Sequence, residues 1–576
     1  MYSNRFLMVR LATSRPFIAI RRQSTKPARK VLRTLTNPIQ DKKPNFASLS
    51  EAVSRIPSGS NIFVHTCAGT PTELLKEMCA QVDSGKLSDL HLSHILLVGD
   101  IPWNNEKFHG KIRSNCLFID GGTRNLVKEG KIRSNCLFID GGTRNLVKEG
   151  HADYTPIFLS DSATLYSSFA LPVDVALITV SPIDEHGYCT LGVSADCSVS
   201  AVRAAQKIIA MVNESMPRTF GDTIIHCSHI DTLVNARQPI HSKNVSELTT
   251  TETEQKIGRL IAENLVDDGA TLQIGNEIEK EVRGRILAGS DERKASHQNR
   301  RPREHPGLDH LYYDRGKVSK VVTSTQDNTI DKILEATLLL FAVGHGLEFI
   351  PQRGIGAIPD SVLSAMRHHR ELGVHTEMFS DGVIDLIEKN VITNSRKTVD
   401  VGKVVATFAF GTSKFYRFID NNPLFVFKSC GYTNDPQLIK RHHKMTAINS
   451  AIEVDLTGQI VSDSIGASFY SGFGGQTDFV YGSAVAEDGQ GKSIIALAST
   501  TAKGQSKIVP FIKEGAGVVA TRGHSRYIVT EYGIANTWGK SVRRRAYELI
   551  QIAHPNHRER LEKAAFERLK CMPSKD

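Results

Sequence analysis

The sequence Asp174-Val175-Ala176-Leu177-Ile178-Thr179-Val180 is a continuous apolar run. Such a run is typical of a strand that is buried on both faces of a sheet. The residues that follow it predict a short helix over 200–206 and a second apolar strand, Lys207-Ile208-Ile209-Ala210-Met211-Val212. Because buried strands alternate with helices here, the sequence predicts a largely parallel α/β sheet covered on both faces.

The same alternation extends along the chain. Upstream, Asn61-Ile62-Phe63-Val64-His65 predicts a strand, and Pro71 opens a helix. Downstream, the pattern resumes after about residue 250 and runs to Val529, where two terminal helices follow. At 576 residues the chain is too long for one ordinary core. We therefore expect two α/β domains, 41–240 and 241–570, divided near residues 235–250.

Positive charge is concentrated at the N-terminus. The formal net charge is +10, and residues 1–40 contain no Asp or Glu but many basic residues: Arg5, Arg10, Arg15, Arg21, Arg22, Lys26, Arg29, Lys30 and Arg33. This composition predicts a mitochondrial transit peptide over residues 1–40, with a basic disordered tail as the alternative. The remainder is close to neutral, which argues against a nucleic-acid-binding surface. No stretch has the ~20 apolar residues of a membrane span.

The cysteine and histidine spacings indicate neither zinc nor disulfides. The nine cysteines include no C-x-x-C pair and no zinc-finger spacing. His186 lies in a turn without a second histidine at ligand spacing, and we expect it to be structural. The sequence thus predicts free thiols in a reduced mitochondrial matrix and no metal site.

Two segments interrupt the pattern. Residues 111–130 recur letter for letter at 131–150, each copy predicting a strand, a Gly-Gly turn and a short helix. Because a second unit cannot enter a formed sheet without shifting its neighbours, we expect one copy to loop out; a duplication and a gene-model error both remain open. Residues 275–353 form an insertion whose charged part resembles disordered sequence. It separates the predicted strand 269–274 from a glycine turn.

This glycine turn, Gly354-Ile355-Gly356-Ala357-Ile358-Pro359-Asp360, has the features of an anion site. Its glycines can expose backbone N–H groups, and Pro359 suits a first helical turn. The following helix should end at Gly373 and bury one apolar face, formed by Val362, Leu363, Met366 and Leu372. A purely structural turn is the alternative.

The strand after this helix carries the candidate nucleophile. It reads Val374-His375-Thr376-Glu377-Met378-Phe379, and its period of two places His375 and Glu377 on one face. With an ordinary pKa near 4.3, Glu377 would be ionised at neutral pH and could act as a nucleophile without a base partner. A buried glutamate with a structural partner, or an exposed strand charge, is the alternative.

Two further loops are candidates for ligand contact. The segment Ser471-Gly472-Phe473-Gly474-Gly475-Gln476 favours close approach of a ligand, and the Gln476 amide could hold a carboxylate or thioester oxygen. Residues 499–504 offer hydroxyls and Lys503 to a phosphate, with a solvated loop as the alternative. We expect residues 441–444 to be a solvated helix face.

Several motifs together resemble the acetyl-CoA hydrolase/transferase family, in particular its 4-hydroxybutyrate and acetate CoA-transferase branch. In chain order they are Thr70–Thr72, Val180–Gly187, Met216–Asp222, Gly354–Asp360, His375–Gly382, Gly472–Phe479, Val529–Ala535 and Ile552–Pro555. The similarity extends from about residue 45 to 565, interrupted by the second repeat copy and by the insertion.

The resemblance implies two CoA-transferase-like α/β domains with the active site between them. It implies that Glu377 forms a glutamyl-CoA thioester. It also implies a CoA site, to which we assign the residues Gly354, Ile355, Gly356, Ala357, Ile358, Gly472, Gly474, Gly475, Gln476 and Lys503. Coenzyme A is then a substrate, and no permanently bound cofactor is expected.

The expected activity is transfer of CoA between acetyl-CoA or succinyl-CoA and a short carboxylate such as acetate, in acetate metabolism. An acetyl-CoA hydrolase and an inactive acyl-CoA-binding paralogue or mis-spliced product are the alternatives, the last because the ends of the insertion are compatible with a retained intron. The expected partners are acyl-CoA and short carboxylates, with no nucleic acid and no membrane; a homodimer is possible.

Overall fold

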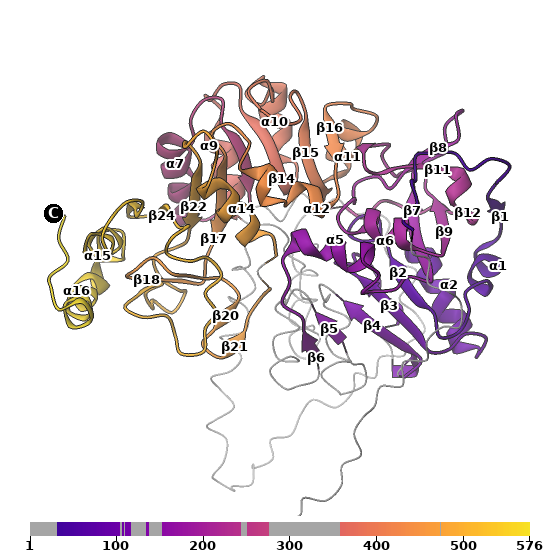
Figure 1. The fold of residues 1–576 in the computed structure, drawn as a ribbon, viewed down its shortest axis with the longest axis horizontal. Coiled ribbons are helices and arrows are strands. Elements are labelled where there is room, and N and C mark those ends of the chain that lie inside the picture. The colour runs from indigo at the N-terminus through magenta and orange to yellow at the C-terminus, as the bar shows by residue number, and fades with distance from the viewer. Residues whose placement is uncertain are drawn as a thin grey trace, which may run out of the picture.

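The computed structural model describes residues 31–103, 106–108, 110–116, 134–136, 152–242, 250–275, 357–472 and 474–575. These residues form two nine-stranded sheets and three small ones. Figure 1 shows the first large sheet in indigo and magenta and the second in salmon and orange. The predicted glycines Gly354 and Gly356 and most of the insertion lie outside the described residues.

The first sheet is parallel throughout, as predicted. Its strands, in spatial order, are β1 (Asn45–Phe46), β12 (Thr232–Asn235), β9 (Lys207–Val212), β7 (Val175–Val180), β2 (Asn61–Val64), β3 (Leu90–His94), β4 (Ile112–Cys116), β5 (Ser134–Cys136) and β6 (Ala152–Tyr154). Every residue of β7 is buried. The apolar run that predicted a strand covered on both faces therefore lies near the centre of the sheet.

Both copies of the repeat contribute a strand to this sheet. Strand β4 comes from the first copy and β5 from the second, and they pair at the same repeat position, Ser114 with Ser134. Strand β6 then pairs with β5. The expectation that one copy loops out was wrong. The pair lies near one end of the sheet, so the added strand displaces only β6 and leaves the central strands unchanged.

The second sheet is also parallel except at one end. Its order is β10 (Phe220–Gly221), β16 (Phe425–Phe427), β15 (Val404–Ala409), β14 (Gly373–Phe379), β13 (Thr271–Ile274), β17 (Thr446–Ser450), β22 (Lys492–Ala496), β24 (Tyr527–Thr530) and β25 (Gly533–Asn536). Only β25 runs antiparallel to its neighbour. Strand β10 precedes the expected domain division and pairs with β16, so the first half of the chain reaches into the second sheet.

Three small sheets flank the large ones. Strands β18 (Glu453–Asp455), β19 (Ile460–Val461) and β23 (Ile508–Val509) form one, and β20 (Ser464–Ile465) and β21 (Ser468–Phe469) form a hairpin. Strands β8 (Tyr188–Thr190) and β11 (Ile224–His226) form the third.

Helices cover the sheets, and local signals define several of their ends. The larger helices are α1 (Leu49–Ser54), α2 (Thr72–Asp83), α5 (Leu159–Ser167), α6 (Ser198–Ala204), α7 (Glu252–Leu265), α9 (Ala357–Ala365), α10 (Gly382–Glu388), α11 (Ser413–Ile419), α14 (Gln476–Ala484), α15 (Val542–Gln551) and α16 (Pro555–Leu569). Capping boxes start α1, through Ser48 and Glu51, and α7, through Thr251 and Glu254. None of the helices in the described part of the chain has the length and apolar character that a membrane crossing requires.

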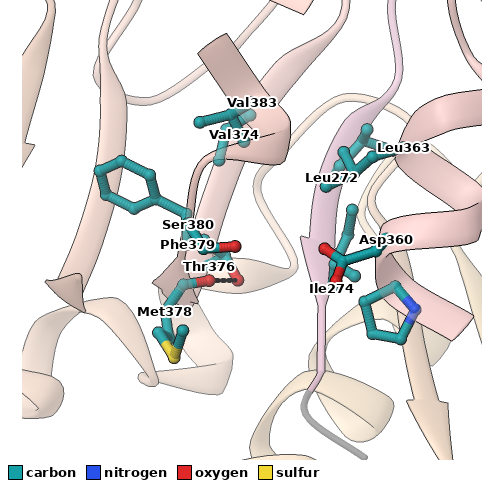
Figure 2. A pocket seen from close by; sticks show the side chains of 11 residues that line it. Leu272, Ile274, Asp360, Leu363, Val374, Thr376, Met378, Phe379, Ser380 and Val383 are labelled. Carbon is teal, nitrogen blue, oxygen red and sulfur yellow. Dashed lines mark hydrogen bonds between the residues drawn. The ribbon is translucent and has the colours of Figure 1, made fainter. Parts of the chain in front are cut away.

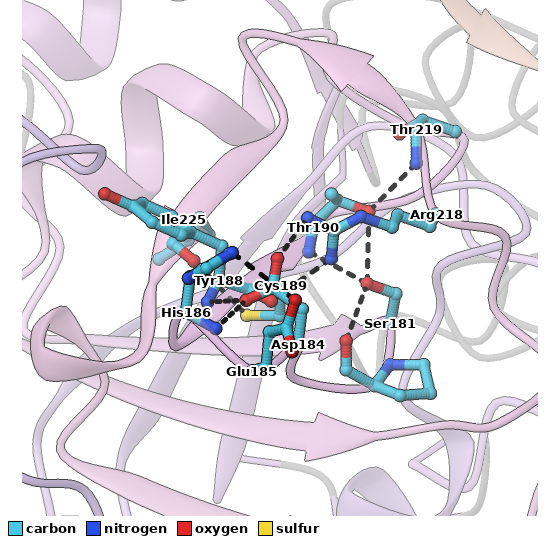
Figure 3. A network of polar contacts seen from close by, with 11 residues as sticks. Ser181, Asp184, Glu185, His186, Tyr188, Cys189, Thr190, Arg218, Thr219 and Ile225 are labelled. Atoms are coloured by element: carbon cyan, nitrogen blue, oxygen red, sulfur yellow. Dashed lines mark hydrogen bonds and ion pairs between the residues drawn. The ribbon is translucent and has the colours of Figure 1, made fainter. Parts of the chain in front are cut away.

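One hydrophobic core runs through both sheets. It joins β7 and β9 of the first sheet, through residues such as Ile178 and Ile208, to Leu272 and Val374 of the second. Polar contacts of the turn that follows β7 also connect the two halves of the chain. In that turn Asp184 binds the Arg218 guanidinium at 2.6 Å and accepts the backbone N–H groups of His186 and Tyr188 (Figure 3). The backbone N–H of Arg218 in turn donates to Asp420.

The end of the predicted leader belongs to the fold. Arg33 is buried and donates to the backbone carbonyls of Ala205 and His229, at 3.2 and 2.7 Å. Leu35 is part of the main core. Residues 33–35 therefore pack against the first sheet, which contradicts the disordered-tail alternative for these residues. The transit peptide over residues 1–40 stays a prediction.

The helix after the predicted glycine turn ends earlier than expected. Helix α9 stops at Ala365, and Glu371 takes the left-handed φ of 54° in the turn that follows. Gly373 is instead the first residue of β14. A Cβ there would approach the Cγ of Lys397 to 2.6 Å. The expectation that Gly373 ends the helix was wrong, since this glycine serves close packing rather than a helix end.

Candidate active site

Strand β14 presents different side chains on its two faces, as its period of two predicted. On one face Val374, Thr376 and Met378 line a cavity (Figure 2). On the other, His375 and Glu377 contact the consecutive residues Thr433 and Asn434. The candidate nucleophile therefore points away from the cavity and toward the segment after the short helix α12 (Cys430–Thr433).

Two groups contact the carboxylate of Glu377. The side-chain amide of Asn434 donates to Oε2 at 3.2 Å. The backbone N–H of Gly475, at the start of α14, is the second hydrogen-bond donor. The fit is close, because a Cβ on Gly475 would lie 2.2 Å from Glu377 Oε2 and 2.1 Å from Asn434 Nδ2. Glycine is thus required at this position by space rather than by backbone conformation, whose φ is −96°.

The environment of Glu377 raises its pKa. Its side chain keeps some accessible surface, yet protein groups surround the carboxylate. Burial raises the pKa of Glu377 to about 7, while the hydrogen bonds from Asn434 and Gly475 act in the opposite direction. The assumption of an ordinary, fully ionised glutamate was therefore wrong. At neutral pH this group is divided between its two protonation states, as is common for groups in active sites.

Residues from both sheets meet around this carboxylate. Burial, with a smaller contribution from the Glu377 charge, raises the pKa of the Cys67 thiol, which follows β2, and raises that of Cys430 in α12 to about 12. Burial also raises the pKa of Asp478 to about 8, again with a contribution from Glu377. Asp478 accepts from Ser160 Oγ of α5 at 3.0 Å. The candidate site therefore lies where the two sheets meet, as the resemblance implied.

The cavity on the opposite face of β14 is mainly apolar. Its volume is about 30 Å³, and it is lined by Leu272, Ile274, Pro359, Asp360, Leu363, Val374, Thr376, Met378, Phe379, Ser380 and Val383. In Figure 2 the side chains of β13 and α9 form one wall, and those of β14 with Ser380 and Val383 form the other. Two of its lining residues, Ile274 and Pro359, are close in sequence to the two ends of the segment 276–356, which lies outside the described residues.

The predicted CoA-site residues differ in where the structure places them. Gly354, Ile355 and Gly356 lie outside the described residues, Ala357 begins α9, and Ile358 is buried in the core. The loop 472–476 is the part that the structure brings to Glu377. There the Gly474 carbonyl accepts the backbone N–H of Leu159 at 3.1 Å, which joins this loop to α5.

Two further predicted CoA contacts, Gln476 and Lys503, differ in their surroundings. The Gln476 amide nitrogen donates to the Ser450 carbonyl at 3.0 Å, so one of its donors already supports β17. Lys503 is exposed on a turn whose Gly504 carbonyl contacts His557 of α16. The nearby Ser499 instead binds Glu531, through Oγ at 2.6 Å. Contact of Gln476 or Lys503 with CoA remains a prediction.

The segment 441–444 is not a solvated helix face. It is a turn before β17, and His442 is buried at 1% exposure with its ring 4.4 Å from that of His375. The expectation was wrong because a run of polar letters does not show that one of them turns inward. Asn434 was also missed, since nothing in the local sequence connects it to a glutamate 57 positions earlier.

Comparison with known proteins gives the family. The description "Acetyl-CoA hydrolase/transferase N-terminal domain" matches residues 39–241, and the corresponding C-terminal domain matches 411–565. A protein of Fasciola hepatica described as "Succinyl-CoA:acetate/propanoyl-CoA:succinate CoA transferase" is 41% identical over 539 residues, covering 93% of this chain and 91% of its own. This chain belongs to the acetyl-CoA hydrolase/transferase family.

Two other CoA transferases are similar over about as much of the chain, at lower identity. The 4-hydroxybutyrate coenzyme A transferase of Clostridium kluyveri is 35% identical over 90% of this chain and 96% of its own. A solved 4-hydroxybutyrate CoA-transferase from Porphyromonas gingivalis has a TM-score of 0.62 and 28% identity, covering 91% of this chain and 98% of its own. Acetyl-CoA hydrolases are more distant, at 26–28% identity.

Proposed function

We propose that this protein is a CoA-transferase that moves CoA between a short acyl-CoA, such as acetyl-CoA or succinyl-CoA, and a short carboxylate such as acetate. One observation carries the proposal: the carboxylate of Glu377 lies where the two sheets meet and accepts from Asn434 and Gly475. The relatives named as CoA transferases support the same activity.

The reaction uses Glu377 as a covalent nucleophile. Its carboxylate attacks the acyl-CoA carbonyl carbon and expels CoA thiolate, leaving an acyl–glutamyl anhydride. The thiolate then attacks the glutamyl carbonyl, releases the first carboxylate and forms the glutamyl-CoA thioester. A second carboxylate repeats these steps in reverse and leaves as the new acyl-CoA. The thioester bond energy is conserved throughout, so ATP is not required.

The surroundings of Glu377 suit this chemistry. When thiolate attacks the glutamyl carbonyl, negative charge develops on the oxygen that Asn434 and Gly475 already contact. Fixed donors at such a position stabilise the developing charge, by about 3–4 kcal/mol for one donor in well-studied enzymes. A pKa near 7 also makes the ionised carboxylate more basic, and hence more nucleophilic, than an ordinary glutamate.

Exclusion of water separates the transferase from the alternative acetyl-CoA hydrolase. Water that reached the anhydride or thioester would hydrolyse it. The packing of Gly475 against Glu377 and of Leu159 against Gly474 leaves little room beside the carboxylate. The lower identity to acetyl-CoA hydrolases also favours transfer as the main activity, with hydrolysis as a side reaction.

The cellular setting belongs to the same proposal. The basic, acid-free N-terminal residues support import into the mitochondrial matrix, where acetyl-CoA and succinyl-CoA are the proposed donors. A homodimer is proposed as the assembly. Mass-spectrometric detection of peptides from residues 280–345 in the native protein would establish that the insertion is translated, and their absence would support the retained-intron hypothesis.

One assay tests the activity. The purified full chain is incubated with acetyl-CoA, with and without succinate, and the enzyme thioester is trapped with borohydride or hydroxylamine. Transfer requires the acceptor and gives a modified Glu377, whereas hydrolysis proceeds without the acceptor. An inactive acyl-CoA-binding paralogue would give neither product nor adduct. A Glu377→Ala protein that still transfers CoA would contradict the proposed mechanism.

A further inference from the structure

His442 is a buried imidazole whose position is unexplained by folding alone. It lies between α13 (Pro436–Ile439) and β17, and neither ring nitrogen has a hydrogen-bond partner in the described part of the chain. Burying an imidazole without partners destabilises the fold, whereas an apolar ring of similar size would bury without that cost. A histidine here is therefore expected to serve something other than stability.

The ring of His442 packs against His375. The two ring centroids are 4.4 Å apart, with the planes tilted by 44°. The Nε2 atom of His375 lies 2.8 Å from the Thr433 carbonyl, so it carries the hydrogen and donates. Its Nδ1 has no partner among the described residues. The orientation of the His375 ring thus depends on that single hydrogen bond and on the rings beside it, His442 and Phe479.

From Thr433 the connection continues to the nucleophile. The next residue, Asn434, donates to Glu377 Oε2 at 3.2 Å, and its Nδ2 lies in the space that a Cβ on Gly475 would fill. A small rotation of His375 would therefore move the Thr433 carbonyl and displace the Asn434 amide from the carboxylate. Misplacement by about 1 Å in an active site can reduce the rate roughly 100-fold.

We propose that His442 is a positioning residue for Glu377, acting through His375, Thr433 and Asn434. The proposal rests on the proposed function, because it concerns the same nucleophile. His442 acts as a neutral ring. The charges that face the pair are Lys397 and Arg441, both of which disfavour a charged His442, and Asp400 lies beside Lys397. The role therefore needs no change in the protonation of His442 itself.

The test is His442→Leu in the full chain, which keeps a buried apolar side chain but removes the ring that packs against His375. We expect the melting temperature to stay equal or rise, the KM for acetyl-CoA to stay unchanged, and kcat to fall about tenfold. The acid limb of the rate profile should also move up by roughly one pH unit, because a weaker Asn434 hydrogen bond raises the pKa of Glu377. His442→Phe, which keeps a ring beside His375, should recover part of kcat.

The neighbouring histidine provides the matched control. His443 is partly exposed and pairs with Asp488 at 3.2 Å, so His443→Leu should match the wild type in kcat and pH profile. Wild-type kcat and pH profile in a folded His442→Leu protein would overturn the positioning role while the wild type still transfers CoA. A wild type without transfer and without a Glu377 adduct would instead refute the proposed function.

Discussion

The two faces of strand β14 are both largely enclosed, yet they differ in chemistry. One face carries His375 and Glu377, whose partners are hydrogen-bonding groups from α12 and α14. The other carries Val374, Thr376 and Met378, which line a mainly apolar cavity. Because adjacent residues point in opposite directions, single substitutions on the two faces should have separate effects on catalysis and on stability. Changes on the first face should alter catalysis most strongly, and changes on the second should mainly alter stability.

The largest effect is expected from Glu377→Gln. The amide cannot form the anhydride or the thioester, so kcat for CoA transfer should fall on the order of 10⁴-fold or more. Transfer between acetyl-CoA and succinate, together with hydroxylamine trapping, measures this loss. Met378→Leu, a change at the next residue and on the cavity face, is the matched control and should leave kcat within about twofold. Comparable losses in the two proteins would contradict the division between the faces.

The second effect concerns Gly475, which packs against the carboxylate of Glu377. Gly475→Ala places a methyl group 2.1–2.2 Å from Asn434 Nδ2 and Glu377 Oε2, so kcat should fall by about 10²–10³-fold. Gly523→Ala is the control, because its added Cβ meets only the Thr521 hydroxyl at 3.6 Å. Steady-state kinetics of both proteins give the comparison. Full activity in Gly475→Ala would show that this contact opens in the working enzyme.

The third effect is on pH dependence. The nucleophile is the ionised form of Glu377, whose pKa is about 7, so kcat/KM should fall about tenfold per pH unit below pH 7 and level off above it. An ordinary glutamate would place this limb near pH 4.3. A rate profile from pH 5 to 9 distinguishes the two. A limb near pH 4 would refute the raised pKa.

The same pKa has a consequence for stability. A carboxyl group whose folded-state pKa is raised above its unfolded value destabilises the fold as it ionises. The penalty is absent below the unfolded pKa and complete above about pH 7. Glu377→Gln should therefore become more stable relative to the wild type as pH rises from 5 to 8, which thermal denaturation at several pH values measures. An unchanging difference in melting temperature would contradict this linkage.

The cavity face should respond in stability rather than rate. Val374 is buried against the core, and Val374→Ala should reduce the free energy of unfolding by about 2 kcal/mol through lost packing. Transfer by the folded protein should keep a kcat within about twofold of wild type, since Glu377 points the other way. Chemical denaturation and kinetics on the same preparation test both halves. A large fall in kcat at unchanged stability would place this side chain in the catalytic site.

The smallest effect is expected at Lys503. If its ammonium group meets a CoA phosphate, Lys503→Ala should raise the KM for acetyl-CoA about three- to tenfold and leave kcat unchanged, as for loss of one exposed charge contact. Lys570→Ala, at the end of α16, is the control. An unchanged KM would remove Lys503 from the proposed CoA site.

The fold was largely predictable from the sequence, and the site only in part. Strands β2, β7, β9 and β14 lie where apolar runs and periodicity predicted them. The expectation that one repeat copy loops out was wrong, because a sequence pattern does not show whether a strand joins a sheet near its end or near its centre. His442 was misjudged as well, because the burial of one residue in a polar run depends on what packs against the turn.

The sequence by itself determined the alternation of strands and helices, and it placed Glu377 and His375 on one face of a strand, because these properties follow from local periodicity. Only the tertiary structure decided the hydrogen-bond partners and the pKa of that carboxylate. Asn434 and Gly475 reach it from segments 57 and 98 residues away, and burial at the meeting point of two sheets raises its pKa to about 7. Hydrogen bonding and desolvation depend on which groups surround an atom in space, and no local pattern specifies them.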